Sequence, residues 1–390
     1  MKKKIAILGS TGSIGKTLLN IIEKDKKNFE IVLLTANKDY KTLHSQAKKF
    51  NAKNIIINNQ RFFEILKKKK SHYKIFNNFN EFKKIFKSKI DYVMSSIVGI
   101  EGLDPTLKII KFTKKIAIAN KESIICGWNL INSEIKKNNT KFIPVDSEHF
   151  SMWYGLQNLS ISNLEKIYLT ASGGPFYKTP LAKFNKISSK EATKHPNWKM
   201  GKKISIDSAT MINKVYEVIE AKNIFNLTYN KIGIYVHPSS YLHSILKFKN
   251  GLIKLIAHET TMKIPIYNTL GFNFITGIKT KKININNLNN LNLTNVNLKR
   301  YPIVKIIKSL PLNNSLYYTV IVSVNDTLVD LFLKNKIKFN DIQKMFFKYS
   351  KSKELLKYKK KYPLNVEDIL DLSKYVRLKI QKKVYKSKNV

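Results

Sequence analysis

Short apolar runs alternate with longer segments of helical periodicity in the first part of the chain. The apolar runs are residues 4–8, 31–34, 54–57, 92–97, 116–119 and 143–145. A short apolar run between turn residues predicts a buried strand, and apolar residues at helical spacing predict a helix. Because strands that alternate with helices form parallel sheets, we predict an α/β fold with an N-terminal Rossmann-type, doubly wound parallel sheet.

The pattern changes in the second half of the chain. Apolar runs at residues 167–169, 232–236 and 251–258 predict a second sheet, and residues 279–299 have no clear period. Periodic segments at residues 303–309, 319–333, 339–347 and 366–384 predict a small helical domain. We therefore predict four parts: residues 1–145, a middle α+β domain at 146–278, a linker at 279–299 and a C-terminal helical domain at 300–390.

A glycine-rich turn, Gly9 to Gly15, follows the first predicted strand and opens a helix. Strand, glycine-rich turn and helix is the context of a dinucleotide site, and the alternative is a tight turn without a ligand. The second strand ends at Asn37-Lys38-Asp39. Lys38 can pair with a 2′-phosphate, which favours NADPH, whereas Asp39 can accept a ribose hydroxyl, which weakens that preference.

Two polar triplets follow later strands of the predicted sheet, where ligands of doubly wound folds bind. They are Asn120-Lys121-Glu122 and Asp146-Ser147-Glu148. Two carboxylates separated by one residue on a turn can face one cation, and oxygen ligands suit Mg²⁺ or Mn²⁺. The alternative is that Asp146 or Ser147 caps the helix predicted at residues 150–159.

Residues 195–217 begin with residues typical of a loop, including Pro196 and Gly201. A predicted helix follows, which starts at Asp207 or Ser208, both good N-cap residues. Asn213 and Glu217 are four residues apart and share a helix face, with Lys214 beside them. Free N–H groups at a helix start, an amide, an ammonium and a carboxylate suit an anionic, oxygen-rich ligand. The alternative is a capped surface helix.

The charge balance is extreme, with a net charge of +45 over 390 residues. Such a charge can indicate a nucleic-acid partner. However, only three of the 71 basic residues are arginine, at positions 61, 300 and 377, so the other 68 are lysines spread along the chain. Because sequence-specific binders depend on bidentate arginine contacts, we predict no specific nucleic-acid partner.

The remaining composition predicts a soluble cytoplasmic protein. Cys126 is the single cysteine, so an internal disulfide and a multi-thiolate metal site are excluded. No apolar stretch approaches the ~18 residues of a membrane span. The first strand follows three N-terminal lysines, which leaves no room for a signal peptide.

Seven motifs together resemble the 1-deoxy-D-xylulose 5-phosphate reductoisomerase family. They occur in the family's order at residues 9–15, 119–123, 144–149, 169–176, 195–217, 237–244 and 300–302. The resemblance implies an enzyme that converts 1-deoxy-D-xylulose 5-phosphate, a sugar phosphate, to 2-C-methyl-D-erythritol 4-phosphate in isoprenoid synthesis. It also implies NADPH, Mg²⁺ or Mn²⁺ as cofactors, and a homodimer formed by the middle domain.

The resemblance assigns roles to individual residues. It implies that Lys121, Glu148 and His195 are catalytic, and that Asp146, Glu148 and Glu217 hold the metal. The implied substrate contacts are Lys121, Ser147, Glu148, Ser172, His195, Trp198, Ser208, Asn213, Lys214 and Glu217, with the Trp198 loop closing over the substrate. The implied cofactor contacts are Thr11, Gly12, Ser13, Ile14, Asn37, Lys38, Asp39, Asn120, Glu122 and Gly201.

Several positions depart from the family pattern. Asn37, Asp39, Phe150, Thr261 and Lys263 stand where the family has other residues. Two further hypotheses therefore remain. The first is another NADP-dependent oxidoreductase, which would not need the three carboxylates, and the second is a retained fold without activity.

Overall fold

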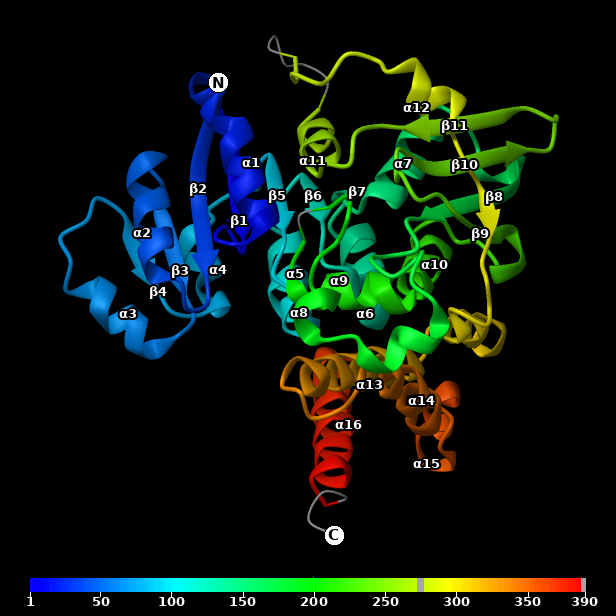
Figure 1. Cartoon of the computed structure of the whole chain (residues 1–390). Helices are drawn as coiled ribbons and strands as arrows, with labels where there is room; N and C mark the ends of the chain where they lie inside the picture. Colours follow the sequence, from blue (N-terminus) through cyan, green and yellow to red (C-terminus); the bar gives the residue numbers. More distant parts are fainter. Residues whose placement is uncertain (199, 272–276, 387–390) are drawn as a thin grey trace. The chain divides into compact units, whose positions relative to one another are not determined.

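The computed structural model describes residues 1–198, 200–271 and 277–386. The described residues pack into two compact units (Figure 1). The first unit comprises Met1–Ser123, Asn129–Phe150 and Thr261–Thr280, and the second comprises Ile124–Trp128, Ser151–Thr260 and Lys281–Val390. Helices α6 (Lys121–Lys137) and α7 (Ser147–Gly155) contain residues of both units.

The first unit is built on a seven-stranded sheet in the order β4-β3-β2-β1-β5-β6-β7, and all its strand pairs are parallel. The sheet confirms the predicted doubly wound fold. Its strands are β1 Lys3–Leu8, β2 Phe29–Ala36, β3 Asn54–Ile57, β4 Lys74–Phe76, β5 Tyr92–Ser95, β6 Lys115–Ile118 and β7 Lys141–Pro144. The strand order reverses at β1, so the loop after β1 lies at the switch point where such sheets bind ligands.

Helices connect these strands and bury their apolar stripes. They are α1 Ser13–Glu23, α2 Tyr40–Lys49, α3 Gln60–Lys67, α4 Phe82–Ile85 and α5 Leu103–Ile110. The central strand β1 buries Ile5 and Ile7 against Leu18 and Ile22 of α1. Strand β4 was not predicted, because it has three residues and only Ile75 and Phe76 are partly buried.

A distant segment completes the first unit. Helix α11 (Lys263–Thr269) places Ile266 and Leu270 in the same core as Ile5 and Ile7. The hydroxyls of Tyr92 on β5 and Thr269 on α11 are hydrogen-bonded at 2.7 Å. The described residues between 261 and 280 therefore pack with the first unit, whereas the sequence places residues 146–278 in one middle domain.

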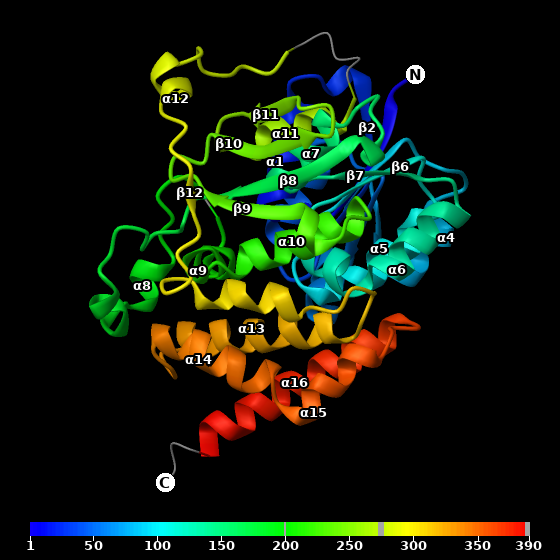
Figure 2. The same cartoon turned by 90° about the vertical axis from the view of Figure 1, so that its right-hand side faces the viewer.

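The second unit has a five-stranded sheet in the order β11-β10-β8-β9-β12 (Figure 2). Its strands are β8 Leu164–Ala171, β9 Ile232–Val236, β10 Leu242–Phe248, β11 Ile253–Ala257 and β12 Thr294–Asn295. Strands β8 and β9 are parallel and the other pairs are antiparallel. Helix α10 (Ile212–Ile224) packs Val218 and Ala221 against Leu169 of β8 and Leu246 of β10.

Helices make up most of the C-terminal part (Figure 2). Besides α10, the second unit contains α8 Ser189–Ala192, α9 Lys202–Thr210, α12 Ile285–Asn289, α13 Tyr317–Leu333, α14 Phe339–Ser350, α15 Lys353–Leu356 and α16 Val366–Lys386, together with short 3₁₀ helices, of which Pro302–Ser309 is the longest. The predicted helical segments after residue 300 are confirmed. The predicted linker at 279–299 contains both α12 and the edge strand β12, so part of it belongs to the sheet.

The helix predicted to start at Asp207 or Ser208 is wrong in its boundary. Helix α9 already runs through both residues, and α10 begins at Ile212. Met211 separates the two helices with φ +65° and ψ 9°, a left-handed conformation that interrupts the helical hydrogen bonds. Asp207 is therefore not a cap but a buried acceptor inside α9.

None of the described helices has the length and apolar character that a bilayer crossing requires.

Candidate active site

The glycine-rich turn leaves backbone N–H groups accessible at the start of α1. Gly9 has φ +81°, and a Cβ on Gly15 would lie 2.6 Å from the carbonyl oxygen of Gly9. The N-cap residue of α1 is Gly12, which has no side chain to cap the helix, and the first turn contains no acidic residue. Gly12 and Ser13 are exposed, and Thr11 and Ile14 are partly exposed. The turn thus has the geometry of an anion-binding helix start.

The triplet after β2 is exposed, and one of its members has a structural role. The Asp39 side chain accepts the N–H of Thr42 at 3.1 Å and caps α2. Asn37 and Lys38 project from the same exposed loop beyond the strand end. Asp39 is therefore partly engaged by its own helix, which leaves Lys38 as the available charged group.

Asn120 caps α6 and ties it to the loop after β5. Its Oδ1 accepts the N–H of Ser123 at 2.8 Å, and its Nδ2 donates to the carbonyl oxygens of Ile97 and Gly99. The side chain of Glu122 is buried in the first turn of α6. These bonds fix the position of the next residue, Lys121.

Lys121 and Asp146 form an ion pair at 2.8 Å between Nζ and Oδ2. Lys121 follows β6 and Asp146 follows β7, and these strands are neighbours in the parallel sheet. Their side chains are only 10% and 16% exposed, so each charge compensates the other in a poorly solvated place. The Ser147 hydroxyl donates to the carboxylate of the adjacent Glu148.

Glu217 is one of two buried acidic residues on α10, with Glu220. It is 1% exposed, and its two oxygens accept hydrogen bonds from Nδ2 of Asn213 and Nζ of Lys214. The predicted shared face of Asn213 and Glu217 is thereby confirmed. The N–H of Ile212 donates to Oγ1 of Thr210 at 3.5 Å, and the N–H of Lys214 donates to the carbonyl oxygen of Met211 at 3.1 Å. The first turn of α10 contains no acidic residue, so the positive end of the helix dipole is not compensated there.

His195 contacts the loop after β8. Its Nδ1 accepts the N–H groups of Asn197 at 3.2 Å and Trp198 at 3.1 Å, so the neutral ring carries its proton on Nε2. Nε2 lies 3.0 Å from Oγ of Ser172. Burial lowers the pKa of His195 to about 4. The ring is therefore a neutral hydrogen-bond donor near pH 7.

The loop of Ser172 is held against α9 by its glycines. The Ser172 hydroxyl accepts the N–H of Gly174 at 3.0 Å. A Cβ on Gly174 would lie 2.8 Å from the carbonyl oxygen of Ser208, and Gly174 has φ +71°. Ser208, on the last turn of α9, is partly exposed, as is Asn213 beyond Met211. Ser172, Ser208 and Asn213 therefore belong to one region of the second unit.

The Trp198 loop is anchored at its start. Asn197 donates to the carbonyl oxygen of Pro238 and to Oγ of Ser240. The Trp198 ring lies edge-on to His243, with 6.0 Å between ring centroids. Lys199 lies outside the described residues, and Gly201 is the exposed N-cap residue of α9.

The structure also identifies supporting residues that the sequence did not. Arg300 donates from Nη1 to the carbonyl oxygens of Phe176 at 2.8 Å and Thr179 at 2.7 Å. The Tyr301 hydroxyl donates to the carbonyl oxygen of Gly173 at 2.7 Å. The motif at residues 300–302 thus fixes the loop that follows β8. The motif itself was the only signal, because the partners are more than a hundred residues away.

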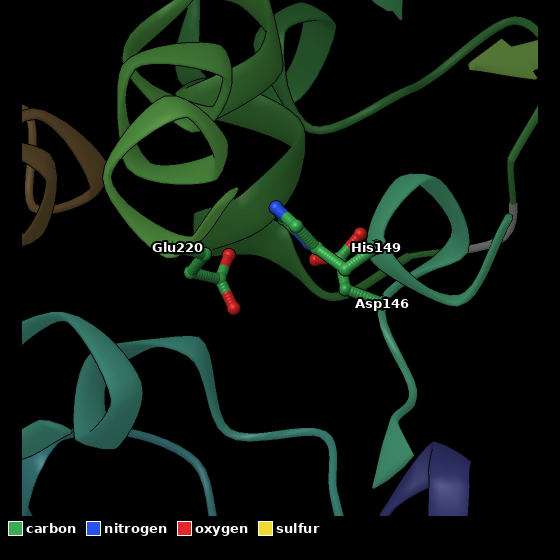
Figure 3. A group of neighbouring side chains, drawn as sticks. All are labelled: Asp146, His149 and Glu220. Carbon is green, nitrogen blue, oxygen red and sulfur yellow. The ribbon is translucent and has the colours of Figure 1, made fainter. Parts of the chain in front are cut away.

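Two candidate sets of cation ligands occur among the described residues. One is Asp146 with Glu148 and Glu217, and the other is Asp146 with His149 and Glu220, drawn in Figure 3. Asp146, Glu148 and His149 come from the junction of β7 and α7, and Glu217 and Glu220 from α10. The first set offers only carboxylate oxygens, the donors that Mg²⁺ and Mn²⁺ prefer.

Three family descriptions match consecutive parts of the chain. The description "1-deoxy-D-xylulose 5-phosphate reductoisomerase" matches residues 5–127, and the C-terminal domain of the same enzyme matches residues 142–225. The description "DXP reductoisomerase C-terminal domain" matches residues 258–379.

Individual proteins agree with these matches. The 1-deoxy-D-xylulose 5-phosphate reductoisomerase of Pelagibacter ubique is 57% identical over 382 residues, which are 97% of this chain and 98% of that protein. The Zymomonas mobilis enzyme in complex with NADPH superposes with a TM-score of 0.86 and is 30% identical over 98% of this chain and 99% of that chain. A reductoisomerase structure with NADPH, fosmidomycin and magnesium gives a TM-score of 0.90 at 28% identity, with 99% of both chains covered.

Proposed function

The chain belongs to the 1-deoxy-D-xylulose 5-phosphate reductoisomerase family, and from this premise we propose which of its residues perform the family's reaction. The protein converts 1-deoxy-D-xylulose 5-phosphate to 2-C-methyl-D-erythritol 4-phosphate with NADPH and a divalent metal ion. The observation that carries the residue assignment is the pairing of two buried lysines with two proposed metal ligands.

Asp146, Glu148 and Glu217 hold the metal ion in this proposal. All three offer hard anionic oxygens, which fits Mg²⁺ and also Mn²⁺. When bound, such an ion acts as a Lewis acid toward the substrate carbonyl and stabilises the charge that develops as the carbon–carbon bond migrates. The set with His149 and Glu220 is the alternative, but its imidazole nitrogen suits Mg²⁺ less well.

Lys121 and Lys214 are assigned to the anionic oxygens of the substrate in this proposal. Their ammonium groups form ion pairs with Asp146 and Glu217, two of the carboxylates that would hold the metal ion. Asn120 and Glu122 are the sequence neighbours of Lys121, and we assign them to the nicotinamide end of the cofactor.

The substrate phosphate binds at the start of α10. Ser172, Ser208 and Asn213 supply hydroxyl and amide donors, and the first turn of α10 contains no acidic residue that would repel the phosphate. His195 donates from Nε2, because Nδ1 already accepts two backbone N–H groups. Trp198 covers the bound substrate, and its loop is fixed at Asn197. These contacts orient the substrate and exclude water from the reacting carbons.

The cofactor lies across the carboxyl end of the first sheet. Thr11, Gly12, Ser13 and Ile14 contact its pyrophosphate, which is supported by the uncapped start of α1. Lys38 pairs with the 2′-phosphate and Asn37 and Asp39 border the ribose. Gly201 is the remaining residue that we assign to the cofactor.

The protein acts as a homodimer in the cytoplasm in this proposal. Strand β11 lies at the edge of the second sheet, and Ile253 and Leu255 are 58% and 51% exposed. An exposed apolar edge strand favours pairing with another chain. Light scattering after size-exclusion chromatography is expected to give twice the chain mass, and a monomer for the variant with Ile253→Lys and Leu255→Lys.

The decisive experiment follows NADPH absorbance with purified protein, 1-deoxy-D-xylulose 5-phosphate and Mg²⁺. We expect oxidation of NADPH only when substrate and metal are both present, and formation of 2-C-methyl-D-erythritol 4-phosphate. Oxidation that survives chelation of the metal would instead indicate an oxidoreductase without a metal-dependent rearrangement. No turnover by a folded protein that binds NADPH would indicate a retained fold without activity.

A further inference from the structure

A cavity of about 380 Å³ lies in the first unit at the amino ends of its parallel strands. Its wall includes Lys3 of β1, Tyr92 of β5, Lys115 of β6, Lys141 of β7 and Leu270 after α11. The glycine-rich turn follows the carboxyl end of β1, whereas the cavity lies at the amino ends of the strands. The cavity and the proposed cofactor site therefore lie at opposite ends of the strands of one sheet. The cavity therefore has no part in the mechanism proposed above.

The register of the sheet brings the lysines to one face. Lys115 pairs directly with Lys141, and Ile5 pairs with Tyr92. Val93 pairs with Ile116, so Tyr92 and Lys115, one residue earlier on each strand, lie side by side. Since alternate residues of a strand project to the same face, Lys3 lies on the face of Ile5. Lys3, Lys115 and Lys141 therefore line the cavity on the same face of the sheet as Ile5 and Tyr92.

Lysines outnumber acids among the described residues in the wall of the cavity. Asp91 is the only acid among the described residues that line it. Its carboxylate already accepts the N–H of Lys4 at 2.9 Å and an ion pair from Lys114 at 2.9 Å. Lys115 is partly buried, and burial, together with the charges of Lys3 and Lys141, lowers its pKa. A half-buried cation repelled by two others is stabilised when an anion binds.

The wall also has an apolar part that a simple ion would not need. Ile5, Phe29, Tyr92 and Leu270 are each less than a tenth exposed as residues, yet all four contribute to the wall. The volume lies at the lower end of the range for small-molecule sites. A suitable ligand therefore combines an anionic group with a small carbon skeleton.

We propose that this cavity binds a small organic phosphate, with its phosphate group between Lys3, Lys115 and Lys141 and its carbon skeleton against Tyr92 and Leu270. A phosphate dianion offers several acceptor oxygens, so it can take hydrogen bonds from all three ammonium groups. The site is additional to the substrate and cofactor sites of the proposed function.

The test uses the full-length protein saturated with NADPH, and n-butyl phosphate as the probe. Calorimetric titration compares the parent with Lys115→Met, which keeps the length of the side chain and removes its charge. Lys382→Met is the matched control, because Lys382 is an exposed lysine on α16. We expect binding to weaken about tenfold or more in Lys115→Met and to stay unchanged in the control.

Two further measurements make the outcome specific. Without the probe, Lys115→Met is expected to raise the melting temperature, because it removes an uncompensated charge, and to leave turnover unchanged. Inorganic phosphate is expected to bind more weakly than n-butyl phosphate at this cavity. The affinity of the substrate site for phosphate is expected to be the same in the parent and in Lys115→Met. Only the difference in affinity between the two proteins therefore measures binding in the cavity.

Four results would overturn the proposal. They are equal affinity of parent and Lys115→Met for n-butyl phosphate, no binding at millimolar concentrations, a lower melting temperature of the ligand-free variant, or equal binding of inorganic phosphate at the cavity. If Lys115→Met does not fold, Lys141→Met provides the same comparison, because Lys141 is exposed. If the cavity does not bind organic phosphate, the turnover assay still tests the proposed function independently.

Discussion

Glu217 is one partner of a buried ion pair, and we also propose it as a metal ligand. Its carboxylate is buried with Lys214, which is only 4% exposed. Removal of one partner of a buried pair leaves the other charge uncompensated, which costs about 3–5 kcal/mol. A test of its catalytic role must therefore separate stability from activity.

We predict that Glu217→Gln lowers kcat by at least ~100-fold, because one anionic metal ligand is lost while the size of the side chain is kept. Mg²⁺ or Mn²⁺ binding is expected to weaken, and NADPH binding to stay near normal. Steady-state kinetics across metal concentrations and fluorescence titration of NADPH measure the three quantities. Turnover near the parent rate at low metal would show that Glu217 is not a ligand.

The double variant Lys214→Met with Glu217→Gln is the control for stability. It removes both charges of the buried pair, so we expect its free energy of unfolding to recover most of the loss seen in Glu217→Gln. Its kcat is expected to remain low. Recovery of activity together with stability would mean that the pair is only structural.

Lys38 is predicted to select NADPH. Lys38→Ala is expected to raise KM for NADPH about tenfold, because a charge-assisted contact to the 2′-phosphate is lost, and to leave KM for NADH nearly unchanged. Lys41→Ala, on the exposed first turn of α2, is the matched control. Equal effects on both cofactors would place the selectivity elsewhere in the loop.

His195 is predicted to make folding stability sensitive to pH. Its pKa is about 4 in the folded protein and near 6.5 when exposed, so between these values the unfolded chain binds more protons. The stability associated with His195 is therefore complete above pH 6.5 and is lost as the pH falls toward 4. The loss amounts to at most roughly 3 kcal/mol.

Urea unfolding of the parent and of His195→Asn at pH 7 and pH 5 measures this contribution. We expect the parent to lose more stability than the variant between the two pH values. Other buried histidines, such as His237 and His243, also have lowered pKa values, but they are common to both proteins. An identical loss in both proteins would contradict the prediction.

Residue contacts within one helix were predictable, whereas contacts between strands were not. The spacing of Asn213 and Glu217 is a local property, and their hydrogen bond follows from helix geometry. The pair of Lys121 and Asp146 depends on which strands are neighbours, and a sequence read alone does not contain that information. The same limit applies to Arg300, which binds carbonyl oxygens of a distant loop.

At the scale of elements, a break between α9 and α10 lies in the proposed substrate region. The left-handed turn at Met211 ends α9 and starts a new helix at Ile212, so a helix N-terminus occurs in the middle of a helical region. Asp207 on α9 accepts from Nδ2 of Asn325 on α13 at 2.7 Å and from Lys203 at 3.1 Å. These bonds hold α9 against α13.

We predict that Asn325→Ala destabilises the protein by about 1–3 kcal/mol, because Asp207 loses a buried donor. Urea unfolding measures the change. Asn340→Ala removes an exposed asparagine pair with Asn185 and is expected to change stability by less than about 0.5 kcal/mol. Equal stability of Asn325→Ala and the parent would mean that Lys203 alone satisfies Asp207.

Apolar periodicity predicted the elements well where it is strong. The strands β1, β3 and β6 each contain at least three consecutive apolar residues, because both faces of a parallel sheet are covered. Strand β10 was missed, because its sequence places His243 and Ser244 among apolar residues, although both are buried. The break at Met211 was missed as well, because tertiary packing and not local preference places a methionine in that conformation.

At the scale of the whole molecule, the charge of +45 belongs to a lysine-rich surface. We predict weak binding to duplex DNA that is indifferent to sequence and falls steeply with salt, since scattered lysines contact only phosphates. Fluorescence anisotropy with two unrelated duplexes at two salt concentrations tests this. Tight binding to one duplex at physiological salt would mean that the lysines form a specific surface.

The division into units was only partly predictable. Composition and periodicity predicted the N-terminal parallel sheet, the sheet of the second unit and the C-terminal helices. They did not reveal that the described residues between 261 and 280 pack with the first sheet, because a seven-residue helix carries little periodic signal. The predicted boundaries at 145 and 278 remain predictions about domains that fold separately.

The position of α11 also has a consequence for the order of synthesis. The ribosome releases the strands of the first sheet long before Ile266 and Leu270, since residues 151–260 are made in between. At ordinary translation rates that interval lasts roughly 10 s. During that time the core around Ile5 and Ile7 lacks Ile266 and Leu270, so apolar surface stays exposed to water. A nascent chain stalled near residue 260 is therefore expected to recruit chaperones that a chain stalled after residue 300 does not.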